Sequence, residues 1–162
     1  PDTGEDQPVG GRGELWVRGP QVMTGYLNNP KATAETIDAD GWLHTGDIAI
    51  IDEHGHMSIV DRMKELIKFK GFQVAPAELE ALLITHPKIL DVAVIGIADE
   101  EAGEVPKAFV VTTADNEVTL EDIQALVSEN LVSYKQIRVL ELIDAIPKSA
   151  AGKILRKELR NR

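Results

Sequence analysis

The chain has 162 residues, of which 43% are hydrophobic and 27% charged, as is typical of a globular protein with a sizeable core. The lack of cysteine excludes disulfides, thiolate metal sites and a cysteine nucleophile, and the formal net charge of −10 argues against a general affinity for nucleic acid. There is no membrane-spanning apolar run, no signal-peptide pattern and no metal-binding spacing among the four histidines, so we expect a cytoplasmic protein without a membrane span or a metal site.

The first 61 residues predict short strands and turns rather than a complete fold. Residues 1–12, which are rich in proline, glycine and acids, are expected to form an exposed loop. The elements predicted after this loop are a strand over residues 14–18, a helix over 31–37, and a hairpin of strands 48–51 and 57–60. This region contains too little apolar sequence for a separate core, so we expect it to be the end of a larger domain.

From residue 62 onward the sequence indicates an α+β unit of about 100 residues. β-branched or alternating runs predict strands over residues 66–68, 72–74, 91–97, 105–112 and 138–143. Helices are predicted over residues 77–85, after residue 119, and over 154–160. Pro76 suits the first turn of the first helix, and Thr119 with Asp122 forms a capping box for the second.

Basic residues are concentrated in two windows of this acidic chain. Residues 62–70 and 148–162 contain ten of the 17 lysines and arginines but only two acids, which gives these windows a net charge of +8. Such local patches on an acidic body suggest an anion site, for example for nucleotide phosphates. The alternative is that both windows are solvated charged faces.

Asp47 is the first candidate site residue. It follows Thr45 and Gly46, and a carboxylate in such a turn can accept hydrogen bonds from the two hydroxyls of a ribose. The alternative is that Asp47 only caps the turn into the following strand.

The second candidate is the segment over residues 60–74. Lys64 and Lys68 are four residues apart, and Lys68 and Lys70 would share one face if residues 66–70 formed a strand. Gly71 would permit close approach of a ligand to the backbone. The alternative is an exposed basic hairpin.

The third candidate is the loop over residues 147–156, where Lys153 follows Gly152. A glycine allows the loop to bend sharply, and a lysine at its tip is a flexible positive charge for a phosphate or carboxylate oxygen. The alternative is a solvated basic tail that leads into a short helix.

These segments resemble three signature regions of the adenylate-forming superfamily, in the family's order and at its usual separations. They are Gly41–Asp47 (GWLHTGD), residues 60–80 (VDRMKELIKFKGFQVAPAELE) and residues 147–156 (PKSAAGKILR). The chain is most similar to the acyl-CoA synthetase branch, and within it to the 4-coumarate–CoA ligase and firefly-luciferase-like group. The family's glycine-rich and Ser/Thr-rich phosphate loop is not found, so the chain is interpreted as a C-terminal portion.

The resemblance implies an α+β fold with a small C-terminal domain that has a central antiparallel sheet flanked by helices. The implied division is a β-rich remnant of the large N-terminal domain over residues 1–61, a hinge over 62–65, and a mobile C-terminal domain over 66–162. The N-terminal domain of the same enzyme is then the expected partner. The isolated chain is expected to be inactive without it.

The implied activity is that of an ATP-dependent acid–CoA ligase, whose carboxylic acid is aryl or fatty. The acid attacks the α-phosphate of ATP to form an acyl-adenylate, and the thiol of coenzyme A then displaces AMP. The implied cofactors are ATP or AMP, coenzyme A, and Mg²⁺ held mainly by the N-terminal domain and ATP. By the same resemblance, Lys153 serves the first step, whereas Lys68 and Gln73 serve the second. The remaining implied roles are ribose binding by Asp47, contact with AMP by Arg62, the hinge at Lys64, and the coenzyme A entry at Lys70 and Gly71.

Three alternatives stay open. A luciferase-like oxygenase shares the adenylation step, although the chain ends in Asn-Arg rather than the Ser-Lys-Leu peroxisomal signal. Another branch of the superfamily transfers the acyl group to a carrier protein. A non-catalytic nucleotide-binding module is the third.

Overall fold

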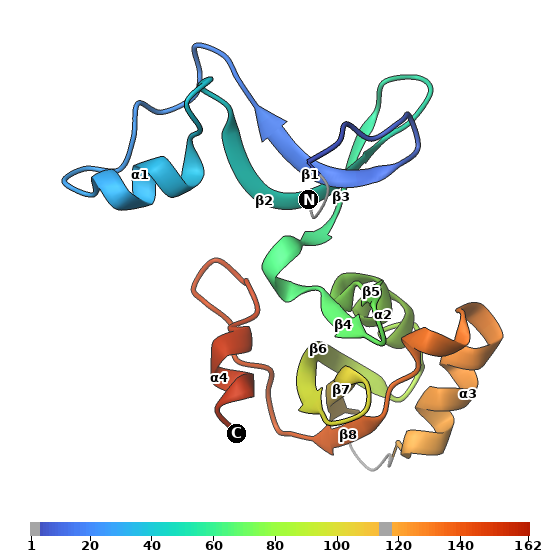
Figure 1. Cartoon of the computed structure of the whole chain (residues 1–162). Helices are drawn as coiled ribbons and strands as arrows, with labels where there is room; N and C mark the ends of the chain where they lie inside the picture. The colour runs from blue at the N-terminus through green and yellow to red at the C-terminus, as the bar shows by residue number, and fades with distance from the viewer. Residues whose placement is uncertain (1–3, 114–117) are drawn as a thin grey trace. The chain divides into compact units, whose positions relative to one another are not determined.

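The computed structural model describes residues 4–113 and 118–162, and the chain divides into two units, Pro1–Lys64 and Glu65–Arg162 (Figure 1). Of the N-terminal loop expected over residues 1–12, residues 1–3 lie outside the described part. Residues 4–11 have no helix or strand, and the first strand begins at Arg12.

The first unit is built on a three-stranded antiparallel sheet in the order β1-β2-β3. Its elements are β1 (Arg12–Val17), α1 (Pro30–Thr36), β2 (Leu43–Ile51) and β3 (Met57–Arg62). Helix α1 begins at Pro30, one residue earlier than expected, because the Asn29 side chain accepts a hydrogen bond from the Ala32 N–H. Ile48 and Ala49 are the buried apolar residues among those described in this unit.

The second unit contains a five-stranded sheet and most of the apolar core. Its elements are β4 (Ile67–Phe69), β5 (Phe72–Val74), α2 (Pro76–Leu83), β6 (Ile89–Asp99), β7 (Gly103–Thr112), α3 (Leu120–Asn130), η2 (Ser133–Lys135), β8 (Val139–Leu142) and α4 (Arg156–Arg160). A short 3₁₀ turn, η1 (Met63–Glu65), spans the boundary between the units.

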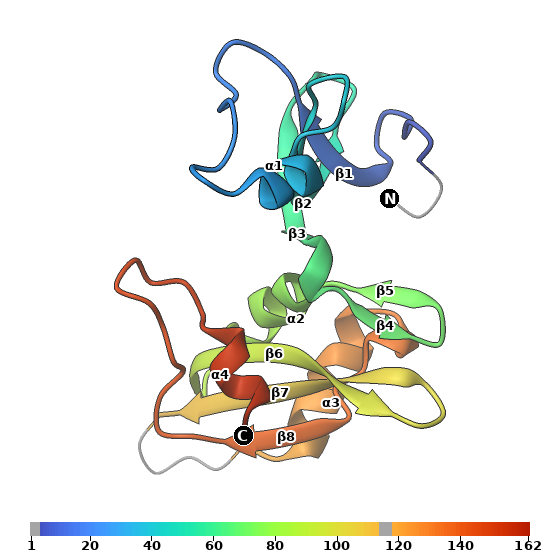
Figure 2. The same cartoon turned by 60° about the vertical axis from the view of Figure 1, so that its left-hand side comes forward.

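Successive side chains of β6 and β7 point to opposite faces of this sheet, and side chains on both faces are buried. Val92 and Val94 face helices α2 and α3, whereas Ala93 and Ile95 face the segment that ends in helix α4. Figure 2 shows α4 on one side of β6 and β7, and α3 on the other. The α+β class with helices on both faces is therefore confirmed.

The sheet differs from the expected antiparallel arrangement at one strand. Strands β5, β4, β7 and β6 pair antiparallel, but β8 runs parallel to β7. The reason is the connection: helix α3 lies between β7 and β8 in the chain, and a helical crossover returns the chain to the end of the sheet where the previous strand began.

Local signals determined several boundaries. The capping box of α3 is confirmed, because the Thr119 hydroxyl accepts from the Asp122 N–H and the Asp122 carboxylate accepts from the Thr119 N–H. The last helix was expected from residue 154 but begins at Arg156, because Ile154 forms a β-bridge with Lys148. In the parts of the chain that the structure describes, every helix is too short or too polar to cross a bilayer.

Candidate active site

Asp47 and Arg62 lie opposite each other in the first unit. Asp47 is inside strand β2 and Arg62 ends strand β3, and the antiparallel register pairs the two residues. Arg62 Nε lies 2.7 Å from Asp47 Oδ1. The side chains are 24% exposed for Asp47 and 61% exposed for Arg62, so a ligand can reach both. Asp47 is thus a strand residue in a surface ion pair.

Hydrogen bonds from strand β1 hold the backbone that leads into Asp47. The Thr45 hydroxyl donates to the Leu15 carbonyl at 2.8 Å, and the Asp47 N–H donates to the Thr45 hydroxyl oxygen at 3.1 Å. Gly46, at φ +70°, donates its N–H to Glu14 Oε1 at 3.0 Å. Glu14 was not identified from the sequence, because its contact with Gly46 depends on the pairing of two distant strands.

His44 also belongs to this turn region. Its ring stacks on Trp16, with ring centroids 4.0 Å apart, and its Nε2 lies 3.3 Å from Asp38 Oδ2. Asp38 Oδ1 accepts hydrogen bonds from the N–H groups of Trp42 and Asp40. The Trp42 hydrogen bond is the largest cause that lowers the pKa of the Asp38 carboxyl below its ordinary value, and His44 adds to it.

Lys64 lies in η1, and its side chain is exposed. The boundary between the two units falls directly after it. On the other side of this boundary, Glu65 forms an ion pair with Arg160 of α4. Glu65 is therefore tied to the second unit.

Lys68 and Gln73 are directly opposite each other on the β4–β5 hairpin, and both are exposed. Lys70 and Gly71 form the two-residue turn between the strands, with φ of +47° and +83°. Positive φ at both positions is the signature of a type I′ turn. The expectation that Lys68 and Lys70 share a strand face is wrong, because β4 ends at Phe69 and Lys70 enters the turn.

A carboxylate from β7 holds the strand that carries Lys68. The Lys68 N–H donates to Glu104 Oε2 at 2.8 Å, and the Lys70 N–H donates to the Ala102 carbonyl at 2.8 Å. Glu104 is a further residue that the sequence did not reveal. The two bonds tie the hairpin to the edge of β7.

The third candidate, Lys153, lies on a loop that closes on itself. The Ser149 N–H donates to the Lys153 carbonyl at 2.8 Å, and the Lys153 N–H donates to Ser149 Oγ at 3.2 Å. Gly152, at φ +79°, donates its N–H to the Ser149 carbonyl at 2.8 Å. Lys153 is thus exposed on an ordered turn rather than on a loose tail.

The two candidate catalytic lysines are carried at opposite ends of the sheet of the second unit (Figure 2). The β4–β5 hairpin joins β7 at Gly103. The loop is attached at the other end, where Lys148 Nζ lies 2.5 Å from the carboxylate of Asp91, the partner of Val111 on β7. At about 3.3 Å per residue, the stretch of β7 between Gly103 and Val111 spans ~26 Å.

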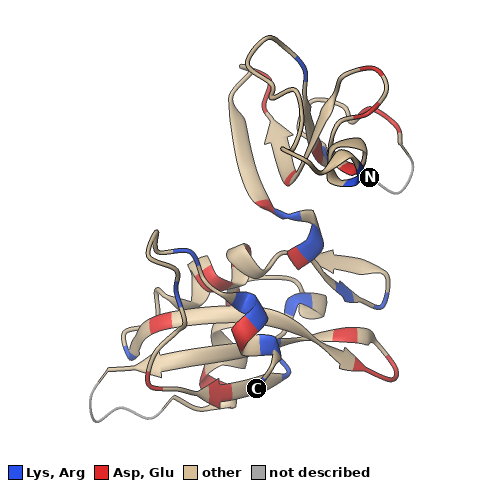
Figure 3. Ribbon diagram, turned by 90° about the vertical axis from the view of Figure 1, so that its left-hand side faces the viewer, with Lys and Arg blue, Asp and Glu red and all other residues tan. Residues whose placement is uncertain are grey.

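Among the described residues, the ammonium groups of Lys68 and Lys153 have no ion-pair or hydrogen-bond partner in the protein. Other lysines of the same unit are paired with acids, namely Lys107, Lys135 and Lys148. Helix α4 is also rich in basic residues, with Arg156, Lys157 and Arg160 among its five positions (Figure 3). Two unpaired exposed lysines leave their charge available to an anionic ligand.

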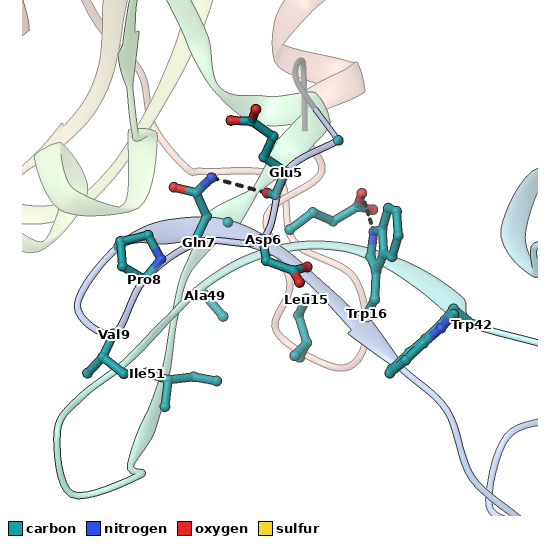
Figure 4. A pocket seen from close by; sticks show the side chains of 14 residues that line it. Glu5, Asp6, Gln7, Pro8, Val9, Leu15, Trp16, Trp42, Ala49 and Ile51 are labelled. Carbon is teal, nitrogen blue, oxygen red and sulfur yellow. Dashed lines mark hydrogen bonds between the residues drawn. The ribbon is translucent and has the colours of Figure 1, made fainter.

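A hollow of about 560 Å³ lies in the first unit, between the N-terminal segment and the sheet (Figure 4). Trp16, Trp42 and Ile51 line it. None of the predicted site residues is among the residues that line it, so it is separate from the Asp47–Arg62 pair.

The described residues contain no cluster of potential metal ligands. No three histidine, aspartate or glutamate side chains among them gather around one point. Mg²⁺ in nucleotide sites is usually held by one or two carboxylates together with phosphate oxygens and waters, so the implied Mg²⁺ would depend mainly on the nucleotide for its ligands.

Comparisons with known proteins show what the chain is similar to. The family profile "AMP-binding enzyme C-terminal domain" matches residues 78–153. A curated relative, 4-coumarate–CoA ligase 1 from Arabidopsis thaliana, is 59% identical over 99% of this chain and 28% of its own length. The chain thus spans less than a third of the length of the curated relatives it matches.

Two solved structures are similar over nearly the whole chain. An amide bond synthetase from Marinactinospora thermotolerans is 35% identical with a TM-score of 0.89, over 99% of this chain and 33% of that one. An o-succinylbenzoate CoA synthetase from Bacillus subtilis, in complex with its acyl-adenylate intermediate, is 32% identical with a TM-score of 0.87, over 96% of this chain and 32% of that one. Residues 78–153 thus match the profile of an AMP-binding enzyme C-terminal domain, and nearly the whole chain is similar to part of adenylate-forming enzymes such as the 4-coumarate–CoA ligases.

Proposed function

We propose that this chain is part of an ATP-dependent acid–CoA ligase, which adenylates a carboxylic acid and transfers the acyl group to coenzyme A. Two observations carry the proposal: the second unit has two unpaired lysines at opposite ends of one sheet, and the first unit has an exposed carboxylate, Asp47, that suits a ribose. One relative, 59% identical, is named as a 4-coumarate–CoA ligase, and this name supports an arylpropenoate as the acid. Medium-chain fatty acids are our second choice.

Asp47 and Arg62 would bind the AMP part of the nucleotide. The free lone pairs of the Asp47 carboxylate suit the two ribose hydroxyls, which are hydrogen-bond donors. Arg62 holds this carboxylate from one side at 2.7 Å and leaves further N–H groups for a phosphate or ribose oxygen. The bonds from Thr45 and Glu14 keep the strand in place before the nucleotide arrives.

Lys153 would serve the first step. A carboxylate oxygen of the acid bonds to the α-phosphorus of ATP, and the bond from that phosphorus to the bridging oxygen breaks to release pyrophosphate. Two anionic reactants repel each other, so the step requires positive charge at the point where they meet. The exposed ammonium group of Lys153, on its closed loop, can supply that charge.

Lys68 and Gln73 would serve the second step. The sulfur of coenzyme A bonds to the acyl carbon, the carbon–oxygen bond to AMP breaks, AMP leaves with the electron pair, and the thiol proton goes to solvent. Lys68 can stabilise the negative charge that develops on the acyl oxygen or on AMP, and Gln73 can donate a hydrogen bond beside it. Lys70 and Gly71, at the hairpin turn, would border the entry for coenzyme A.

One orientation of the second unit does not suit both steps, because its two lysines are at opposite ends of the sheet. We therefore propose that residues 62–65 act as a hinge between the half-reactions, with Lys64 at its centre. The position of the unit boundary after Lys64 supports this role. A larger N-terminal domain of the same enzyme would carry the acyl pocket and the Mg²⁺–ATP site, and the chain alone would then be inactive.

The test uses the full-length gene product with ATP, coenzyme A and a panel of arylpropenoic and fatty acids. Pyrophosphate release that depends on the acid, together with a thioester detected by mass spectrometry, is the expected result. Absence of acid-dependent pyrophosphate release with every acid would refute adenylation. Pyrophosphate without thioester would refute coenzyme A as acceptor, and an amine or a carrier protein would then be tested in its place.

A further inference from the structure

The loop that carries Lys153 is tied to the core of the second unit by carboxylates on other elements. Arg156, the first residue of α4, places Nη2 2.6 and 2.8 Å from the two carboxylate oxygens of Glu80 on α2. Lys148, on the other side of the loop, pairs with Asp91 at 2.5 Å. Each side of the loop therefore ends in an ion pair to the core.

The Glu80–Arg156 pair is the more shielded of the two anchors. Its side chains are 14% and 17% exposed, whereas those of Asp91 and Lys148 are 31% and 40% exposed. Glu80 Oε1 also accepts the Val94 N–H at 2.8 Å, and Arg156 Nε donates to the Val94 carbonyl at 3.3 Å. One pair thus joins α4, α2 and β6 through hydrogen bonds.

Shielding increases the effect of such a pair. Exposed ion pairs contribute little because water screens them, but loss of one partner of a shielded pair leaves a charge without compensation. Charge-assisted hydrogen bonds also restrict geometry more tightly than a contact of apolar groups. Glu80 therefore restricts both the position and the direction of Arg156.

The restriction extends to Lys153, because the loop between the anchors is closed by its own hydrogen bonds. The two bonds between Ser149 and Lys153 and the bridge of Lys148 with Ile154 hold the loop as one piece. A shift of Arg156, three residues after Lys153, would displace the loop as a body. Displacement of about 1 Å at a reacting group can reduce a rate ~100-fold.

We propose that Glu80 is a positioning residue for the adenylation step, which acts through Arg156 on the loop of Lys153. This inference rests on the proposed function, in which Lys153 serves that step. Glu80 itself contacts Arg156 at the base of the loop and the backbone N–H of Val94 on β6.

The first test is Glu80→Gln in the full-length gene product, since glutamine keeps the size of the side chain and removes the charge. We expect the rate of adenylate formation to fall about 10–100-fold. The rate of thioester formation from synthetic acyl-adenylate should stay within about 3-fold of the wild-type rate. The reason is that misplacement of Lys153 affects only the step that uses Lys153. Arg156→Lys, which keeps the charge and loses the fork geometry, should give an intermediate adenylation rate.

The matched control is Glu78→Gln on the same helix. Glu78 pairs with Lys135, whose side chain is 9% exposed, and this pair does not touch the loop. Its loss should lower the thermal midpoint without a selective effect on adenylation. If Glu78→Gln and Glu80→Gln lowered both half-reactions alike, the positioning role would be wrong and the pair merely structural.

The second test measures coupling to the lysine. In a Lys153→Ala background, Glu80→Gln should lower the adenylation rate by less than about 3-fold further, because the group it positions is gone. A full additional loss would overturn the proposal. If Glu80→Gln does not fold, Arg156→Lys takes its place in both tests. A Lys153→Ala variant without selective loss of adenylation would contradict the proposed function itself, which separates the two failures.

Discussion

Arg62 Nε lies 2.7 Å from Asp47 Oδ1 across the β2–β3 ladder, although 15 residues of chain separate the two side chains. The hairpin register brings a carboxylate and a guanidinium together at the surface of the first unit. Both groups suit a nucleotide, and their contact orients each of them before it binds. Two predictions concern this pair and the lysines Lys68 and Lys153, and two more concern the hairpin turn at Lys70 and the carboxylate of Asp38.

Asp47→Asn should raise the KM for ATP by about 10-fold or more, because a hydrogen bond to a charged group contributes roughly 1.5–3 kcal/mol. The thermal midpoint should change little, because the ion pair with Arg62 is exposed on one side. Glu35→Gln is the control, since it removes an exposed ion pair with Lys31 in the same unit. Initial-rate kinetics and thermal melts make the comparison. An unchanged KM for ATP would contradict the ribose role.

Lys153→Ala should reduce adenylate formation about 100–1,000-fold, as expected for loss of a charge that stabilises the transition state. Thioester formation from synthetic acyl-adenylate should be nearly unaffected, and Lys68→Ala should show the reverse pattern. The assays are pyrophosphate exchange and single-turnover thioester formation. Lys157→Ala, which removes an exposed charge on α4, should leave both rates unchanged. Equal losses in both steps for each variant would refute the division of roles.

Lys70→Asn should weaken coenzyme A binding without loss of stability. Lys70 has φ +47°, a left-handed conformation that asparagine tolerates better than lysine does. We therefore expect an equal or higher thermal midpoint and a KM for coenzyme A raised several-fold by the lost positive charge. Gly71→Ala should instead lower the free energy of unfolding by about 1–2 kcal/mol, because alanine is strained at φ +83°. A steric clash adds nothing to this loss, because no atom lies within 4 Å of the added Cβ. A lower midpoint for Lys70→Asn would contradict this account.

Asp38→Asn should reduce the acid sensitivity of the first unit. The pKa of Asp38 lies below its ordinary value of 3.8, chiefly because of the Trp42 N–H. A carboxyl whose pKa is lower in the folded protein than in the unfolded chain stabilises the fold at a pH above its pKa in the unfolded chain. This contribution disappears as the pH falls through the pKa of the folded protein. The wild type should thus have a higher thermal midpoint than the variant at neutral pH, and this difference should become smaller below pH 3.8. A difference that does not vary with pH would disagree with this cause.

The features predicted correctly from sequence are local ones. Thr119 and Asp122 are three residues apart, and this spacing is sufficient for a capping box wherever a helix begins. The turn at Gly71 and the start of α2 at Pro76 likewise depend on backbone angles that the residues themselves favour. The parallel pairing of β8 was missed, because strand direction depends on where a crossover returns the chain.

The resemblance and its motifs identified the candidate residues, including Asp47, Lys68 and Lys153, since motif residues can be read one by one. The carboxylates that hold them could not be identified in this way. Glu80 is 76 residues from Arg156 and Glu104 is 36 residues from Lys68. A glutamate on a helix or strand looks like any solvated acid until a distant segment packs against it.

The sequence alone therefore determined the family resemblance, the elements with local signals and the charged groups available for chemistry. Only the tertiary structure decided which charges are paired and which are free. That outcome depends on strand register and helix packing, which bring together groups far apart in the chain. Lys148 and Lys153 lie five residues apart on one loop, yet only Lys148 has a carboxylate partner among the described residues, because Asp91 of β6 lies beside it.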